Sequence, residues 1–250
     1  EGMSITSSIL NPITFKHRDG LLPCQWNTLH ENFKLSAYKT IKYCQPFQKD
    51  GTVKLQFISP DSDVEPTLLA FADDGTRVTI PVSSTNTVVG DITRYYFNFE
   101  FTLGSDYYDK KVYFVINQGS DYWDGEPIYA EDLTDKINNG QIRKIEYSNN
   151  DAVISDLNGY YIDFSTITNN SLDFYFECVD RELNPTTERE ILEATENDVL
   201  ISSTSKSGVI VSTGIIPSYV YWKLQTACGL DEVLINDREY IVNNIEQETV

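Results

Sequence analysis

Apolar and polar residues alternate along much of the chain, which is the pattern of β-strands that bury one face. Residues 52–58 read T-V-K-L-Q-F-I, with Lys54 and Gln56 on the face opposite the apolar side chains. Residues 172–178 repeat the pattern as L-D-F-Y-F-E-C. Because successive side chains of a strand point to opposite faces, both stretches predict amphipathic strands.

Turn signals divide further alternating stretches into short strands. Residues 72–76, A-D-D-G-T, contain an Asp-Gly pair that predicts a hairpin between 66–71 and 77–82. Two more strands are predicted within 93–103 and 110–119. Short strands at this spacing are typical of a sandwich. We therefore expect a mainly-β fold, built of two β-sandwich-like domains.

Helical signals are fewer. Residues 217–228 begin with proline and serine, precede a glycine and have apolar residues at helical spacing, so they predict one clear helix. Weaker patterns predict short helices near 133–137 and 26–33. Residues 186–214 fit either a short helix or hairpins, and their E-N-D and K-S-G turns favour hairpins.

The composition changes at residues 119–127, G-S-D-Y-W-D-G-E-P, where we place a domain boundary. This gives an N-terminal arm plus a β-sandwich domain at 1–118, and an acidic β-rich domain with the helix at 119–250. A long loop within one domain is the alternative. Residues 4–14 are small, polar and interrupted by proline, and we expect this arm to pack against a neighbouring chain.

Charge is distributed unevenly. The net charge is −19, and residues 1–120 hold 11 Lys or Arg against 13 Asp or Glu, whereas residues 121–250 hold 8 against 25. Nucleic-acid binding needs cationic contacts, so this charge argues against phosphate-backbone binding by the second half. Solubility is the simplest role of the charge, and a surface that repels a polyanion or meets a basic partner is the alternative. No apolar run of about 18 residues occurs, so we expect no membrane span.

No catalytic motif stands out in the sequence. The four cysteines are too widely spaced for a zinc motif and are interpreted as reduced, with a Cys24–Cys44 bridge as the alternative. A thiol–imidazole pair of Cys24 with His17 or His30 would lack an orienting group. We therefore expect no enzymatic activity, no cofactor and no metal.

One acidic cluster resembles a ligand site. Trp123 with its neighbours Asp121, Asp124 and Glu126 would suit a sugar subsite, in which an aromatic platform is flanked by carboxylates. The same carboxylates could bind Ca²⁺ through oxygen ligands. A solvated turn is the simpler interpretation.

The stretch 43–57 predicts a sheet edge. Its proline has no N–H to donate to a strand ladder, which favours an edge strand or a bulge. Another chain can add a strand at such an edge. An ordinary edge with no partner is the alternative. The candidate docking residues are Cys44, Gln45, Pro46, Phe47 and Gln48.

Four stretches follow one another in an order that resembles a group of virion proteins. They are Y-C-Q-P-F-Q-K-D-G-T-V-K-L-Q-F at 43–57, G-E-P-I through N-D-A-V at 125–153, L-D-F-Y-F-E-C-V-D-R-E at 172–182 and an Ile-Pro helix with its hairpin at 214–242. The order is similar to that of tail, ring and connector proteins of tailed phages and prophages from Bacteroidetes, including the crAss-like group. The last hairpin departs from that pattern, with Asp237 where a glycine is more usual.

The resemblance implies a structural subunit of a phage tail or neck, located in the virion. Such a subunit would assemble through β-sandwich interfaces with copies of itself and with other virion proteins, as a homo-oligomeric ring around the DNA channel. It would bind no specific nucleic-acid sequence. The alternative function is a β-sandwich module that binds carbohydrate or a cell surface.

Overall fold

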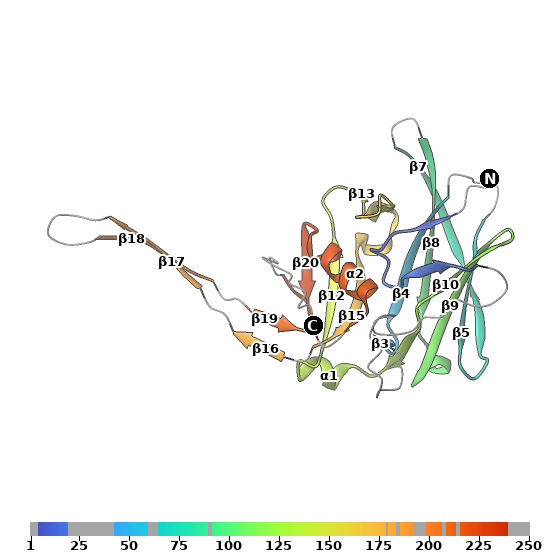
Figure 1. Cartoon of the computed structure of the whole chain (residues 1–250), viewed down its shortest axis with the longest axis horizontal. Helices are drawn as coiled ribbons and strands as arrows, with labels where there is room; N and C mark the ends of the chain where they lie inside the picture. The colour runs from blue at the N-terminus through green and yellow to red at the C-terminus, as the bar shows by residue number, and fades with distance from the viewer. Residues whose placement is uncertain are drawn as a thin grey trace.

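The computed structural model confirms the mainly-β prediction and has four parts (Figure 1). Two sheets pack face to face, a third sheet carries a helix, and a two-stranded ribbon projects from the body. The residues that the structure describes are 5–19, 43–59, 65–89, 92–178, 180–183, 186–192, 199–206, 209–213 and 216–239. The weak helix prediction near 26–33, Cys24 and His30 lie outside them.

The first sheet has four antiparallel strands. They are β1 (Thr6–Ser7), β4 (Thr52–Ser59), β8 (Ile92–Thr102) and β7 (Val82–Val89), in that order across the sheet. The alternation predicted at 52–58 is confirmed, because Val53, Leu55 and Phe57 of β4 are at most 2% exposed. Their face meets the second sheet.

The second sheet has seven strands arranged around β9. They are β2 (Phe15–His17), β3 (Gln45–Gln48), β5 (Thr67–Ala72), β6 (Arg77–Ile80), β9 (Lys110–Gln118), β10 (Asp121–Gly125) and β11 (Ile128–Glu131). β10 and β11 both pair with β9 at successive positions, and β5 also pairs with β9 and carries β6 in the predicted hairpin. β2 pairs with β10, and β3 lies parallel to β11 at an edge.

Aromatic rings fill the space between these two sheets. Phe57 of β4 lies 4.9 Å from Phe15 of β2 and 5.8 Å from Phe99 of β8, measured between ring centroids. Phe101 of β8 meets Phe114 of β9 edge to face at 6.1 Å. Such contacts add to the free energy of apolar burial, and they make the first half β-sandwich-like.

The third sheet lies beside the sandwich and is covered by a helix. Its antiparallel strands are β15 (Leu172–Glu177), β12 (Ile142–Ser148), β20 (Glu232–Ile235) and β21 (Arg238–Glu239). Helix α2 (Ser218–Cys228) confirms the helix predicted from sequence, and it begins after Pro217 and ends before Gly229. Asn236 and Asp237 turn β20 into β21, both with positive φ, as tight hairpins require.

Short elements connect the larger ones. Helix α1, at Thr134–Asn138, confirms the short helix predicted near 133–137. The short elements are α1 (Thr134–Asn138), β13 (Val153–Ser155), β14 (Tyr161–Asp163) and the 3₁₀ turns Ser105–Tyr107, Phe164–Thr166 and Thr168–Asn170.

The ribbon confirms that hairpins, not a helix, follow β15. Strand β16 (Asp180–Leu183) pairs with β19 (Val209–Ser212), and β17 (Thr186–Leu192) pairs with β18 (Val199–Lys206), both antiparallel. Figure 1 shows both pairs extending in series away from the body.

The N-terminal arm packs within its own chain, so the expectation that it reaches a neighbour is wrong for residues 5–14. Ile5 and Ile13 belong to the sandwich core, whereas Leu10 belongs to the core under α2. The Tyr147 hydroxyl of β12 donates to the carbonyl of Leu10, and the Asn11 amide donates to the carbonyl of Gln56 at 2.8 Å. The arm therefore holds the two halves together.

The domain boundary predicted between 118 and 119 is not where the sheets divide. Gln118 and Asp121 are paired across a tight turn, and β10 and β11 complete the second sheet. The chain passes to the third sheet only after β11. Ile142 and Tyr175 of the third sheet also belong to the sandwich core, so the halves share their interior.

Candidate functional site: a buried lysine–glutamate centre

The residues of the predicted sugar subsite lie on or just after β10, but they form no exposed platform. Trp123 is 7% exposed and meets the His17 ring edge to face at 5.2 Å. Asp124 is 5% exposed and accepts hydrogen bonds from the Arg18 guanidinium, at 2.9 Å from Nε. Glu126 is fully buried. Only Asp121, at the hairpin turn, is partly exposed, so the sugar-subsite prediction is wrong in geometry.

The predicted Ca²⁺ alternative also lacks a cluster. Within the described ranges, no group of three or more His, Cys, Asp or Glu side chains could hold a metal ion. Asp124 is occupied by Arg18, and Glu126 by a lysine described below.

The predicted docking stretch is an edge strand, but its side chains are covered. Gln45, Pro46 and Phe47 are at most partly accessible within the fold, with Gln45 and Phe47 no more than 1% exposed. The Phe47 ring lies 5.1 Å from the ring of Tyr175 of the third sheet. The side chains that we expected another chain to contact are therefore packed inside the fold, with Phe47 against the second half of the same chain.

The backbone of β3 explains its proline. Backbone N–H groups at both ends of the strand point to β11. The Gln45 N–H donates to the Pro127 carbonyl at 3.3 Å, and the Lys49 N–H donates to the Glu131 carbonyl at 2.8 Å. The backbone N–H groups of successive residues in a strand point to opposite edges. The backbone of Pro46 therefore faces away from β11, and no N–H is needed there to pair with β11. The two remaining docking residues also have partners within the chain. Cys44 forms no disulfide, and its thiol donates to the Pro127 carbonyl. The side-chain oxygen of Gln48 accepts a hydrogen bond from the Leu133 N–H.

Glu126 lies at the step where the chain leaves β10 and enters β11. Its N–H donates to the Thr14 carbonyl, and its Oε1 accepts from the Thr14 N–H, both at 2.9 Å. The arm thereby fixes the backbone and the carboxylate of one residue at once. Gly125 makes the approach close, because a Cβ at that position would lie 3.0–3.1 Å from Phe15, Ile13 and Phe114.

The side chain of Lys223, from α2 in the other half of the chain, reaches Glu126. It is 0% exposed, and its Nζ donates to the Pro12 carbonyl at 2.6 Å, to Gln45 Oε1 at 3.2 Å and to Glu126 Oε1. An ammonium has three hydrogens, and here each has an acceptor. The face of Phe174 closes one side, with its centroid 5.4 Å from Nζ.

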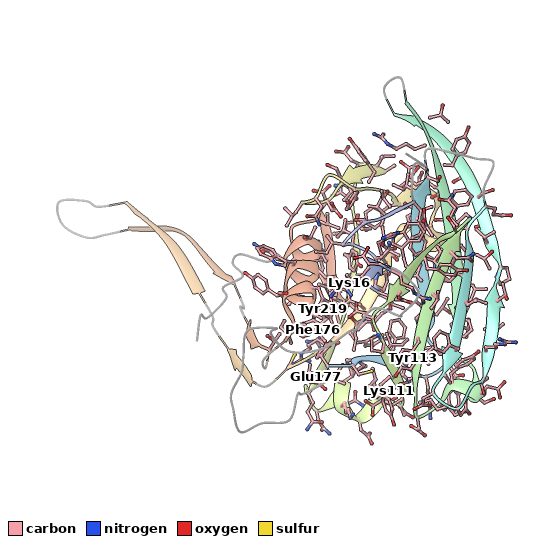
Figure 2. All side chains as sticks on the ribbon, turned by 45° about the vertical axis from the view of Figure 1, so that its right-hand side comes forward. Lys16, Lys111, Tyr113, Phe176, Glu177 and Tyr219 are labelled. Atoms are coloured by element: carbon pink, nitrogen blue, oxygen red, sulfur yellow. The ribbon has the colours of Figure 1, made fainter. Side chains whose placement is uncertain are left out.

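Two tyrosines and a thiol surround the pair. Tyr219, at the start of α2, hydrogen-bonds to Glu126 and is labelled in Figure 2 where the helix meets the sheets. Burial raises the pKa of Tyr219 and of Tyr43, and the charge of Glu126 raises both further. Burial also raises the pKa of Cys44 to about 12. These groups stay protonated, and Glu126 is the carboxyl group that contacts Lys223 Nζ.

Burial lowers the pKa of Lys223, and Glu126 opposes this effect. Moving two charges into an apolar interior costs several kcal/mol for each ion before their attraction is counted. Transfer of one proton from Nζ to the carboxylate removes both charges. Burial thus favours the neutral amine of Lys223 over its ammonium form.

Sequence reasoning missed Lys223, although a signal was present. Val220 and Ala227 lie on the buried stripe of α2, and position 223 is three residues after one and four before the other. A lysine there faces the core by helical geometry. Glu126 was considered only as a surface acid, because its ion-pair partner Lys223 is 97 residues away in the chain.

Comparison with known proteins gives no relative: no protein family, curated protein or solved structure matches the chain. Among the described residues, no helix is long and apolar enough to cross a membrane.

Proposed function

We propose that the chain is a structural subunit of a phage tail or neck that assembles with copies of itself and with other virion proteins. The observation that carries the proposal is the ribbon of β16 to β19. The ordered motif pattern in the sequence supports the same class of protein, and the rest of the fold is compatible with a scaffold role.

Each ribbon strand has one partner strand in the described structure. β16 pairs with β19, and β17 with β18, so neither pair joins another sheet among the described residues. The paired residues of β16 and β17, four and seven in number, correspond to about 36 Å of strand at ~3.3 Å per residue.

A two-stranded hairpin is marginally stable in water by itself, and its outer N–H and C=O groups can pair with another chain. A subunit that docks into a neighbour gains a long interface from few residues. The ribbon is therefore better suited to assembly than β3, whose side chains are packed inside the fold.

The charge of the second half fits the same role. Residues 121–250 carry 25 acidic against 8 basic residues. An acidic surface repels a polyanion at short range and keeps it from adhering. In a ring around a DNA channel, this property would let DNA slide. The carbohydrate-module alternative loses its support, since Trp123 and Glu126 are buried.

Light scattering with negative-stain electron microscopy tests the proposal. The purified full chain should form species with masses that are multiples of 28.5 kDa as its concentration rises. In the test variant, residues 184–208 are replaced by Asn-Gly, a two-residue turn that suits the paired ends Leu183 and Val209. This variant should be monomeric, and its body should still unfold cooperatively in urea, because the three sheets of the body are left intact.

The matched control is Leu157→Ser, which changes an apolar side chain of the body that is 65% exposed. It should assemble like the unmodified chain. The proposal is wrong if the full chain stays monomeric at several milligrams per millilitre, or if the ribbon deletion assembles as well as the full chain.

A further inference from the structure

The buried centre brings an amine and a carboxamide together from opposite halves of the chain. Lys223 Nζ is 3.2 Å from Gln45 Oε1. A carbonyl bond is about 1.23 Å long, so Nζ lies no more than about 4.4 Å from Gln45 Cδ. Reacting atoms in near-attack geometry are ~3–3.5 Å apart, and a small side-chain rotation covers that difference.

The carbonyl oxygen of Pro12 accepts hydrogen bonds from both the lysine and the glutamine nitrogen. The Pro12 carbonyl accepts from Lys223 Nζ at 2.6 Å and from Gln45 Nε2 at 3.2 Å. The attacking nitrogen and the nitrogen that would leave are thus anchored side by side. Glu126 Oε1, which also bonds to Nζ, lies within the same cluster and can exchange protons with it.

The surroundings favour a neutral amine. Lys223, Gln45 and Glu126 are each 0% exposed, and Phe174 lies against the amine. In such a site, burial lowers the lysine pKa, so the ammonium loses its proton more easily than that of an exposed lysine. A neutral amine is nucleophilic, whereas an ammonium is not.

We propose that Lys223 and Gln45 form an intramolecular isopeptide bond, with Glu126 as the proton carrier. Lys223 Nζ attacks Gln45 Cδ, and the bond between Cδ and Nε2 breaks. Glu126 takes a proton from Nζ and delivers it to Nε2, which leaves as ammonia. The products are one secondary amide and one ammonia, so atoms and electrons balance without an oxidant or a co-reactant.

Gln45 is the electrophile in this reaction, and Glu126 is not. An amide formed from Glu126 would expel water and would consume the only carboxyl group that contacts Nζ among the described residues. Attack on Gln45 leaves the Glu126 carboxyl group unchanged. The amide nitrogen of Gln45 leaves as ammonia once it has been protonated. The two routes differ in the mass that is lost.

The bond would join β3 to α2 across 178 residues of sequence. A cross-link that closes so long a loop restricts the unfolded chain strongly. It would lock the third sheet and its helix onto the sandwich. The inference does not depend on the proposed role in a virion, because it concerns one chain only.

Intact-mass spectrometry of the purified full chain tests the bond directly. We expect a mass about 17 Da below the sequence mass, equal to one ammonia. Trypsin should not cut after Lys223, and residues 43–49 and 207–238 should appear as one branched peptide. The variant Glu126→Gln should have its full sequence mass, and Gln141→Ala, which changes an exposed glutamine, should still lose about 17 Da.

Three results would overturn the proposal. The first is a full-length chain at its sequence mass with Lys223 cleavable by trypsin, which needs no variant to fold. The second is a loss of about 18 Da that maps to Glu126. The third is a loss of ammonia that peptide mapping places at Asn139-Gly140, where a succinimide would give the same mass change.

Discussion

Gln56 offers a sharp test of how the two halves are joined. It lies on β4 and is 2% exposed, although the alternating pattern places it on the polar face. Its Nε2 donates to Asn98 Oδ1, to the Asp163 carbonyl and to Thr166 Oγ1 at 2.8–3.0 Å, and its Oε1 accepts from the Asp163 N–H at 2.7 Å. One side chain thus links β4 and β8 to the last residue of β14 and to the turn that follows it.

Replacement of Gln56 with leucine keeps the volume and removes every one of these bonds. An amide group has two hydrogens, so its three acceptors share two donors and about three full hydrogen bonds are lost. At about 1 kcal/mol for each bond, plus 1–3 kcal/mol for a buried N–H left unpaired, the free energy of unfolding should fall by about 4–6 kcal/mol. For a chain of this size, that corresponds to a drop in Tm of about 10–20 °C.

Urea denaturation followed by tryptophan fluorescence and circular dichroism measures this change. The control is Gln141→Leu, at an exposed position outside the interface, which should stay within about 0.5 kcal/mol of the unmodified chain. If Gln56→Leu loses less than about 1 kcal/mol, the halves are not joined through this residue and our account of the interface fails.

Two further predictions concern ionisable groups. The Lys110 ammonium lowers the pKa of Asp74 to about 2, so the stability from this pair is complete above the ordinary pKa of 3.8 and is lost as the pH falls towards 2. Asp74→Asn and Lys110→Met should each flatten the pH dependence of the urea midpoint between pH 2 and 4, and an unchanged slope would contradict the pairing. Burial raises the pKa of Cys44 and Cys228 to about 12 and that of Cys178 to about 11, so these thiols should react with Ellman's reagent at pH 8 far more slowly in the native chain than in urea. Equal rates in the two states would show that the thiols are not buried.

The sequence predicted local structure better than it predicted neighbours. Alternation in β4 located Val53, Leu55 and Phe57 in a core. It failed for Gln56, because alternation distinguishes two faces and cannot tell solvent from a second layer of protein. The α2 helix was found from its ends, since proline and glycine act locally.

The boundary error and the sugar-subsite error have one cause. Asp124 and Glu126 look like solvated acids in a loop, and their composition suggests a linker. Their partners, Arg18 and Lys223, are 106 and 97 residues away in the chain. No pattern within a short window contains that information, so the cluster was assigned to the surface when it belongs to the interior.

The position of the arm has a consequence for synthesis. Residues 5–14 leave the ribosome before their distant partners: Leu10 contacts Tyr147, and the Pro12 carbonyl accepts a hydrogen bond from Lys223. Contacts between residues so distant in sequence form slowly. The second half of this segment is thus translated early but secured among the last, whereas Thr6 and Ser7 can pair with β4 early. A nascent chain halted before α2 should still be vulnerable to proteases there, and helix docking would end that exposure.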